Sequence, residues 1–156
     1  MIITLNDLAS VRERHKGQKI VLTSGTFDLL HTGHLDYLEK VEQYGNIVIV
    51  LLSGDNRTKA RKGSNRPIIP EQDRAKILDC LTIVDYVFID PSKLSPDQTD
   101  SVHSEILNTL KPDYYVTDGA DPRFVDIMDK SKFIILERMH AEPSTTSIIK
   151  QIIDSS

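Results

Sequence analysis

Two histidines stand three positions apart at the end of the segment Thr23–His34, and their surroundings indicate chemistry with phosphate. An apolar run at residues 19–22 precedes the segment and an amphipathic helical pattern at residues 35–41 follows it, so His31 and His34 are expected where a strand turns into a helix. The first turn of a helix has unpaired backbone N–H groups and a partial positive charge, which attract phosphate. A histidine placed there can donate to a phosphate oxygen even when its ring is neutral.

Two other interpretations of this histidine pair stay open. Taken alone, so short a motif is more often a capped helix or a surface turn than a site. Zinc is the second alternative, because two histidines at this spacing can share a helical face. The remaining residues of these types, His15, His103, His140 and Cys80, form no Cys/His cluster that completes a zinc site. Phosphate binding is therefore favoured over zinc.

A basic run reverses the charge of this acidic chain locally. Residues 57–66 contain no acid and five cations, which are Arg57, Lys59, Arg61, Lys62 and Arg66. The run falls in a stretch, Gly54–Pro70, that is expected to be a polar loop. It is either a solvated surface loop or a basic lid that closes over a polyphosphate.

Hydroxyl side chains open the last predicted helix. Ser144 and Thr145 precede an apolar helical pattern, so they either cap that helix or form a second oxyanion site with its free N–H groups. Arg138 stands shortly before them, at the end of a predicted strand.

Two aspartates follow the first two strands of the predicted sheet. Asp28 and Asp55 are expected to face the same crevice, where each could hold magnesium, orient a hydroxyl group or cap a helix. Arg74 lies on the helix after the basic run and could bind a ligand or pair with a neighbouring carboxylate.

Composition narrows the class of protein. A length of 156 residues suits one domain, residues 1–156, and a net charge of −4 does not suggest nucleic-acid binding. A single cysteine is typical of the reducing cytoplasm, and neither a secretion signal nor a membrane span is expected.

Continuous apolar runs alternate with helical patterns along the chain. Helices are predicted at residues 5–15, 35–44, 70–81, 101–110, 124–130 and 144–153, and strands at 19–24, 46–53, 84–89, 113–117 and 132–136. This order predicts an α/β fold with a doubly wound, mainly parallel five-stranded sheet and helices on both faces. Ligands of such sheets bind beyond the carboxyl ends of the strands, where Ser24–His34 is expected.

Three motifs together resemble the cytidylyltransferase-like nucleotidyltransferase family, whose fold is Rossmann-like. They are Gly25–His34, Arg66–Arg74 and Ser144–Ile149, and the resemblance spans roughly residues 18 to 153. The resemblance implies that a phosphorylated small molecule attacks the α-phosphorus of a nucleoside triphosphate, which carries Mg²⁺, and that pyrophosphate leaves. It also implies a homodimer.

The resemblance distributes roles over the candidate residues. It makes His31, His34 and Lys62 catalytic, with no metal held by the protein. It assigns the nucleotide to Gly25, Thr26, Phe27, Asp118, Arg138, Ser144 and Thr145 together with the two histidines, and the acceptor to Asp28, Asp55 and Arg74.

Three branches of the family come close to this chain. The segment Lys62–Pro67 and the leading helix resemble heptose-1-phosphate adenylyltransferases, which favours ATP over CTP. Glycerol-3-phosphate cytidylyltransferases, which tend to carry arginine where Thr82 stands, and FAD synthetases are the alternatives. Glu142 and Pro143 replace the usual glycine before Ser144, so the base and the acceptor stay open. A nucleotide sensor without catalysis is disfavoured by the intact His31, His34, Lys62 and Arg74.

Overall fold

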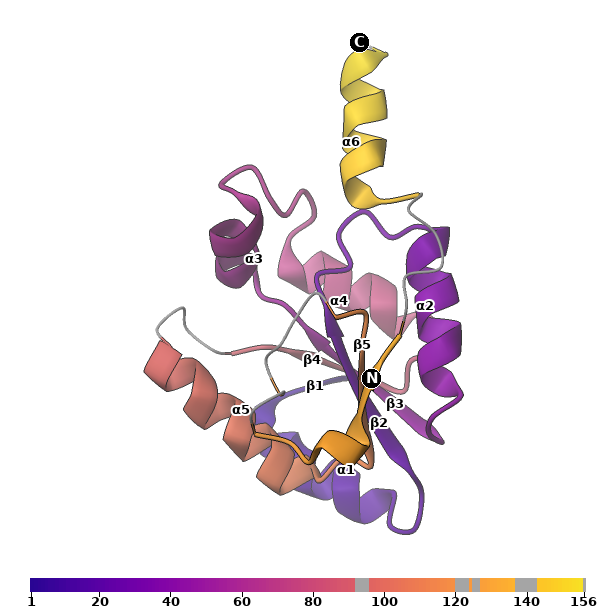
Figure 1. Ribbon diagram of the computed structural model, residues 1–156, viewed down its shortest axis with the longest axis vertical. Helices are drawn as coiled ribbons and strands as arrows, with labels where there is room; N and C mark the ends of the chain where they lie inside the picture. The colour runs from indigo at the N-terminus through magenta and orange to yellow at the C-terminus, as the bar shows by residue number, and fades with distance from the viewer. Residues whose placement is uncertain (92–95, 120–123, 125–126, 137–142, 156) are drawn as a thin grey trace.

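The computed structural model of the protein describes residues 1–91, 96–119, 124, 127–136 and 143–155. Within these ranges a six-stranded sheet with the strand order β1-β4-β3-β2-β5-β6 forms the middle of the molecule (Figure 1). Its strands are β1 Ile2–Ile3, β2 Ile20–Gly25, β3 Ile47–Leu52, β4 Tyr86–Ile89, β5 Tyr114–Thr117 and β6 Phe133–Ile135. Every pair of neighbouring strands is parallel, as the continuous apolar runs predicted.

Helices cover both faces of this sheet. The helices are α1 Leu8–Arg14, α2 Thr32–Glu42, α3 Asp55–Lys62, α4 Glu71–Asp79, α5 Pro96–Leu110 and α6 Thr145–Asp154, with 3₁₀ turns at Leu5–Asp7 and Lys130–Lys132. Leu38 of α2 and Leu78 of α4 belong to one hydrophobic cluster, whereas Leu8 of α1 and Ile106 of α5 belong to the other. The predicted doubly wound, Rossmann-like architecture is therefore confirmed.

The predicted number of strands is wrong. The sheet has six strands, because Ile2 and Ile3 pair with Val87 and Phe88 at the edge of the sheet. A strand of two residues is too short to show a pattern in the sequence. Only Ile3 of this strand is buried, and its pairing partner lies about 85 residues away in sequence, so no local pattern indicates the strand.

The predicted polar loop is also wrong in part, because residues 55–62 form the helix α3. Thr58 is its one buried residue, and its other side chains are mostly charged and exposed. A helix without an apolar stripe gives no 3.6-residue hydrophobic period, so its sequence is typical of a loop.

The final helix α6 starts beside the other elements and then projects away from the body of the molecule (Figure 1). The side chains of Ile152 and Ile153, near its end, are exposed. Among the described residues, no helix has the length and apolar character needed to span a membrane.

Candidate active site

The two histidines stack on each other where the loop after β2 enters α2. Their ring centroids are 3.9 Å apart at an interplanar angle of 29°. The main-chain N–H of His31, the residue that caps α2, donates to Nδ1 of His34 over 3.3 Å. Because Nδ1 of His34 accepts this bond, its Nε2 carries the proton of the neutral ring and is free to donate outward.

The His34 ring is neutral at physiological pH. Burial, then the charges of His31 and Lys62, lower the pKa of His34 from 6.5 to about 4. The charges of Asp28 and Asp118 act in the opposite direction. The ring is therefore a hydrogen-bond donor without being a cation, and Lys62 and Asp118 lie near enough to influence it.

A constrained turn brings the chain from the sheet to these histidines. Phe27 and Leu29 both have a φ of 48°, a left-handed conformation that costs energy for residues other than glycine. The Phe27 ring folds back over Gly25, where an added Cβ would lie 2.6 Å from its Cε2 atom. The same ring lies 5.3 Å from the His34 ring. A side chain at position 25 would therefore clash with the Phe27 ring in its present place.

A buried tyrosine fastens α2 to the sheet. Tyr37 lies one turn after His34, and its hydroxyl lies 2.6 Å from Oγ1 of Thr23 and donates to the carbonyl of Val116 over 3.0 Å. Burial raises the pKa of Tyr37, so its hydroxyl stays protonated. This residue links α2 to β2 and β5, a role that the sequence did not reveal.

The start of α6 docks on the same turn. Oγ1 of Thr145 donates to the main-chain carbonyl of Asp28 over 2.7 Å, although 117 residues separate them in sequence. A Cβ added to Gly33 would lie 3.0 Å from the carbonyl oxygen of Pro143. Ser144 caps α6, since its hydroxyl accepts from the N–H of Ser147. The structure thus brings the predicted hydroxyl pair to the histidine turn.

The carboxylate of Asp28 is buried and accepts three hydrogen bonds from the protein. Its side chain is 1% exposed and accepts from Nε of Arg66 and from the N–H groups of Ile68 and Ile69. Burial acts to raise its pKa, but the bonds from Ile69, Ile68 and Arg66 outweigh burial, so the pKa lies below its ordinary value. Asp28 therefore binds the segment after α3 as a carboxylate.

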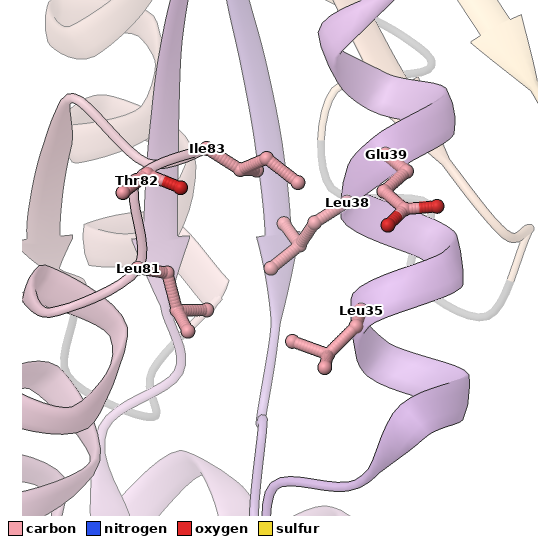
Figure 2. Close-up of a pocket in the computed structure, with 6 residues that line it drawn as sticks. All are labelled: Leu35, Leu38, Glu39, Leu81, Thr82 and Ile83. Atoms are coloured by element: carbon pink, nitrogen blue, oxygen red, sulfur yellow. The ribbon is translucent and has the colours of Figure 1, made fainter.

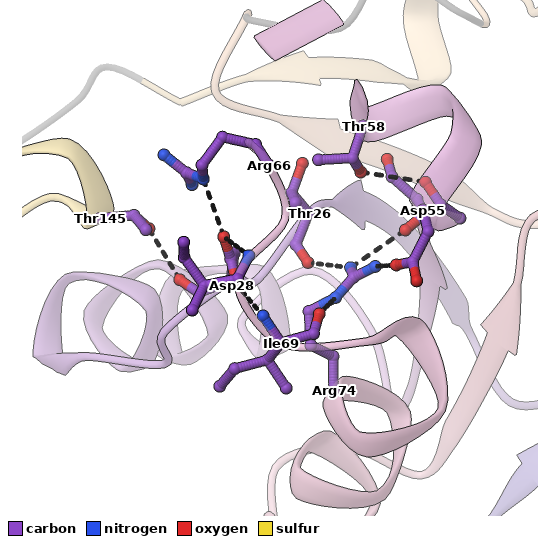
Figure 3. Close-up of polar contacts among 11 residues, drawn as sticks. Thr26, Asp28, Asp55, Thr58, Arg66, Ile69, Arg74 and Thr145 are labelled. Atoms are coloured by element: carbon purple, nitrogen blue, oxygen red, sulfur yellow. Dashed lines mark hydrogen bonds and ion pairs between the residues drawn. The ribbon is translucent and has the colours of Figure 1, made fainter. Parts of the chain in front are cut away.

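Arg74 is buried among protein acceptors as well (Figure 3). It donates to the main-chain carbonyls of Thr26, Ser53 and Ile69. It also pairs with Asp55 at 2.6 Å. Of the two roles considered for Arg74, the structure contains the pair with a neighbouring carboxylate. The Arg74 side chain has no exposed surface to which an acceptor substrate could bind.

Other predicted residues take varied places. Lys62 ends α3, so most of the basic run, which was expected to be either a solvated loop or a basic lid, lies on a helix. Arg138 and Glu142 lie outside the described residues. Within the described part of the chain, no three His, Cys, Asp or Glu side chains group as a metal site.

An apolar groove lies between α2 and the segment that follows α4 (Figure 2). It is lined by Leu35, Leu38, Glu39, Leu81, Thr82 and Ile83. It contains none of the predicted site residues, and its lining includes no cation that would bind phosphate.

Comparison with known proteins identifies the family and the relatives of this chain. The cytidylyltransferase-like family matches residues 22–152. The "Bifunctional protein HldE" of Helicobacter pylori strain HPAG1 is 38% identical over 153 residues, 97% of this chain, and the match spans 31% of that relative's length.

Two solved structures share the fold. A lipopolysaccharide core biosynthesis protein from Thermoplasma volcanium aligns with a TM-score of 0.58 and 21% identity, over 80% of this chain and all of the other. Pantoate-beta-alanine ligase from Francisella tularensis aligns with a TM-score of 0.61 and 18% identity, over 99% of this chain and 77% of the other. With the family match over most of its length, the chain belongs to the cytidylyltransferase-like family of nucleotidyltransferases.

Proposed function

We propose that this chain is an adenylyltransferase that joins ATP to a sugar 1-phosphate, specifically a heptose 1-phosphate, and releases pyrophosphate. A phosphate oxygen of the sugar attacks the α-phosphorus of ATP, and the bond from that phosphorus to the β-phosphate bridging oxygen breaks. The family match and the HldE relatives support nucleotidyl transfer. The choice of heptose phosphate rests on these relatives and on the segment Lys62–Pro67.

The observation that carries the proposal is the stacked pair of histidines at the N-terminus of α2, in which His34 is neutral. Nε2 of His34 would donate to an oxygen of the reacting phosphate, where negative charge grows in the transition state. A neutral donor needs no proton loss or gain during the step. Lys62, at the end of α3, would offset the charge of the leaving pyrophosphate.

Magnesium enters this proposal as part of the nucleotide substrate. We assign the protein no direct magnesium ligand, because protein donors already bind the carboxylate of Asp28 and Asp55 is paired with Arg74. Mg²⁺ would be held by phosphate oxygens and water, as is common for this ion. The protein residues then position the triphosphate and the acceptor for in-line attack.

The test is a screen for pyrophosphate release. ATP, CTP, GTP and UTP are each combined with heptose 1-phosphate, glycerol 3-phosphate and FMN in the presence of Mg²⁺. We expect release with ATP and heptose 1-phosphate to exceed every other pair. Release that is fastest with CTP and glycerol 3-phosphate, or with ATP and FMN, would assign the chain to another branch. Nucleotide binding without turnover in any combination would make it a sensor.

A further inference from the structure

Arg66 has an unused donor buried in the site. It stands between α3 and α4, its side chain is 12% exposed, and its Nε donates to Oδ2 of Asp28 over 2.9 Å. Its Nη2 atom is buried and has no hydrogen-bond partner among the described residues. Figure 3 shows the terminal nitrogens of Arg66 directed past Asp28 toward the side on which Thr145 opens α6.

Asp28 does not satisfy this donor. An arginine and a carboxylate usually form two parallel hydrogen bonds, which would use a second guanidinium nitrogen. Here the second oxygen of Asp28 accepts from the N–H of Ile69, and the first also accepts from Ile68. A buried N–H without an acceptor is costly and calls for an explanation. An anion bound from outside the protein would provide the missing hydrogen-bond acceptor.

The segment that carries Arg66 is held in place from two sides. The N–H of Ile69 binds Asp28, and its carbonyl accepts from Nε of Arg74 over 2.8 Å. Asp28 and Arg74 are each 1% exposed. A cation fixed in this way loses little freedom when it binds an anion, which favours tight binding.

We propose that Arg66, and not Arg74, is the guanidinium that binds a phosphoryl group of the substrates, donating from Nη2 while Nε remains on Asp28. This assignment rests on the proposed function for the identity of those substrates. The phosphoryl group belongs either to the sugar 1-phosphate or to the triphosphate. Both present the same oxygen acceptors, and the experiment below separates them.

The test is calorimetric titration of Arg66→Lys, with Lys76→Gln as the control that removes an exposed cation from α4. Three probes are used, namely α,β-methylene-ATP with Mg²⁺, heptose 1-phosphate and inorganic pyrophosphate. Lysine keeps the charge and can bind Asp28 but lacks the second nitrogen. We expect Arg66→Lys to weaken at least one probe by about tenfold or more, the effect of one charge-assisted hydrogen bond.

The pattern of losses identifies the phosphate. Weaker binding of heptose 1-phosphate alone places the acceptor at Arg66, whereas weaker binding of the nucleotide analogue and pyrophosphate places the triphosphate there. Affinities of Arg66→Lys that stay within about twofold of the wild type for all three probes overturn the proposal. So does a wild type that binds none of them.

Two further readouts keep folding and function apart. The thermal unfolding midpoint of Arg66→Lys is measured first, and Arg66→Gln replaces it if the lysine variant does not fold. A wild type that releases no pyrophosphate but binds a probe through Arg66 would refute the proposed function and leave the role of Arg66 standing.

Discussion

At the scale of single residues, His34 combines a burial and a charge environment that suit a neutral donor. Its pKa of about 4 results from burial first and from the nearby His31 and Lys62 second. Its Nδ1 is occupied by the main chain of His31, which leaves Nε2 for a ligand. The sequence predicted a donor at this position, but not the stacking of the rings, because ring orientation depends on Phe27 and the turn before them.

Replacement of His34 tests its role in the chemical step. His34→Ala should lower kcat by about two to three orders of magnitude, as removal of a transition-state donor does. Steady-state pyrophosphate release measures this change. His15→Ala, whose ring contacts Gln18 and Tyr86 and no predicted site residue, is the matched control and should keep its turnover. A loss of less than twofold in a folded His34→Ala protein would assign His34 a structural role.

The lowered pKa of His34 also predicts how stability depends on pH. The unfolded chain takes up the proton near pH 6.5, and the folded protein takes it up only near pH 4. Because the unfolded state binds more protons in this window, the contribution of His34 is complete above pH 6.5 and declines as the pH falls toward 4. Urea unfolding of the wild type should lose more stability across this window than that of His34→Gln. An equal loss in both proteins would contradict the lowered pKa.

At the scale of elements, the N-termini of α2 and α6 meet at one turn. The bond from Thr145 to the carbonyl of Asp28 joins them, and Gly33 provides the space that the Pro143 segment needs. The sequence predicted α6 from its capping residues and α2 from its apolar pattern, although α2 begins at Thr32 and not at the predicted residue 35. It could not predict their contact, since local patterns contain no distances between segments.

The hydrogen bond of Thr145 can be removed with little change in shape. Thr145→Val should raise the KM for ATP by about tenfold, because a misplaced α6 would no longer complete the nucleotide site. The matched control is Thr109→Val, which makes the same substitution at a half-buried threonine on α5. Unchanged kinetics in Thr145→Val would separate α6 from nucleotide binding.

Sequence patterns predicted the long elements of this fold well and the short or polar ones poorly. The buried strands β2 and β3 and the helix α2 have continuous or periodic apolar residues, so their type was evident. The edge strand β1 has two residues and the helix α3 has one buried residue, so neither produced a pattern. The burial of Arg74 was equally hidden, because its acceptors are main-chain carbonyls from distant segments.

At the scale of the whole molecule, Arg74 joins the carboxyl ends of β2 and β3 to the segment before α4. Arg74→Met should lower the free energy of unfolding by about 3–5 kcal/mol, because it leaves buried acceptors and Asp55 without their cation. Urea denaturation measures this loss. Lys76→Met, an exposed change on the same helix, should stay within about 0.5 kcal/mol of the wild type. An unchanged stability together with a raised KM for the acceptor would instead make Arg74 a substrate contact.

The most direct test of the proposed reaction follows the α-phosphorus of ATP. Wild-type protein is incubated with Mg²⁺, heptose 1-phosphate and ATP labelled either at the α- or at the γ-phosphate, and the products are separated. We predict that the α-label appears in a nucleotide sugar and the γ-label in pyrophosphate, in equal amounts. A γ-label in the sugar product, or an α-label that never leaves ATP and its hydrolysis products, would contradict adenylyl transfer.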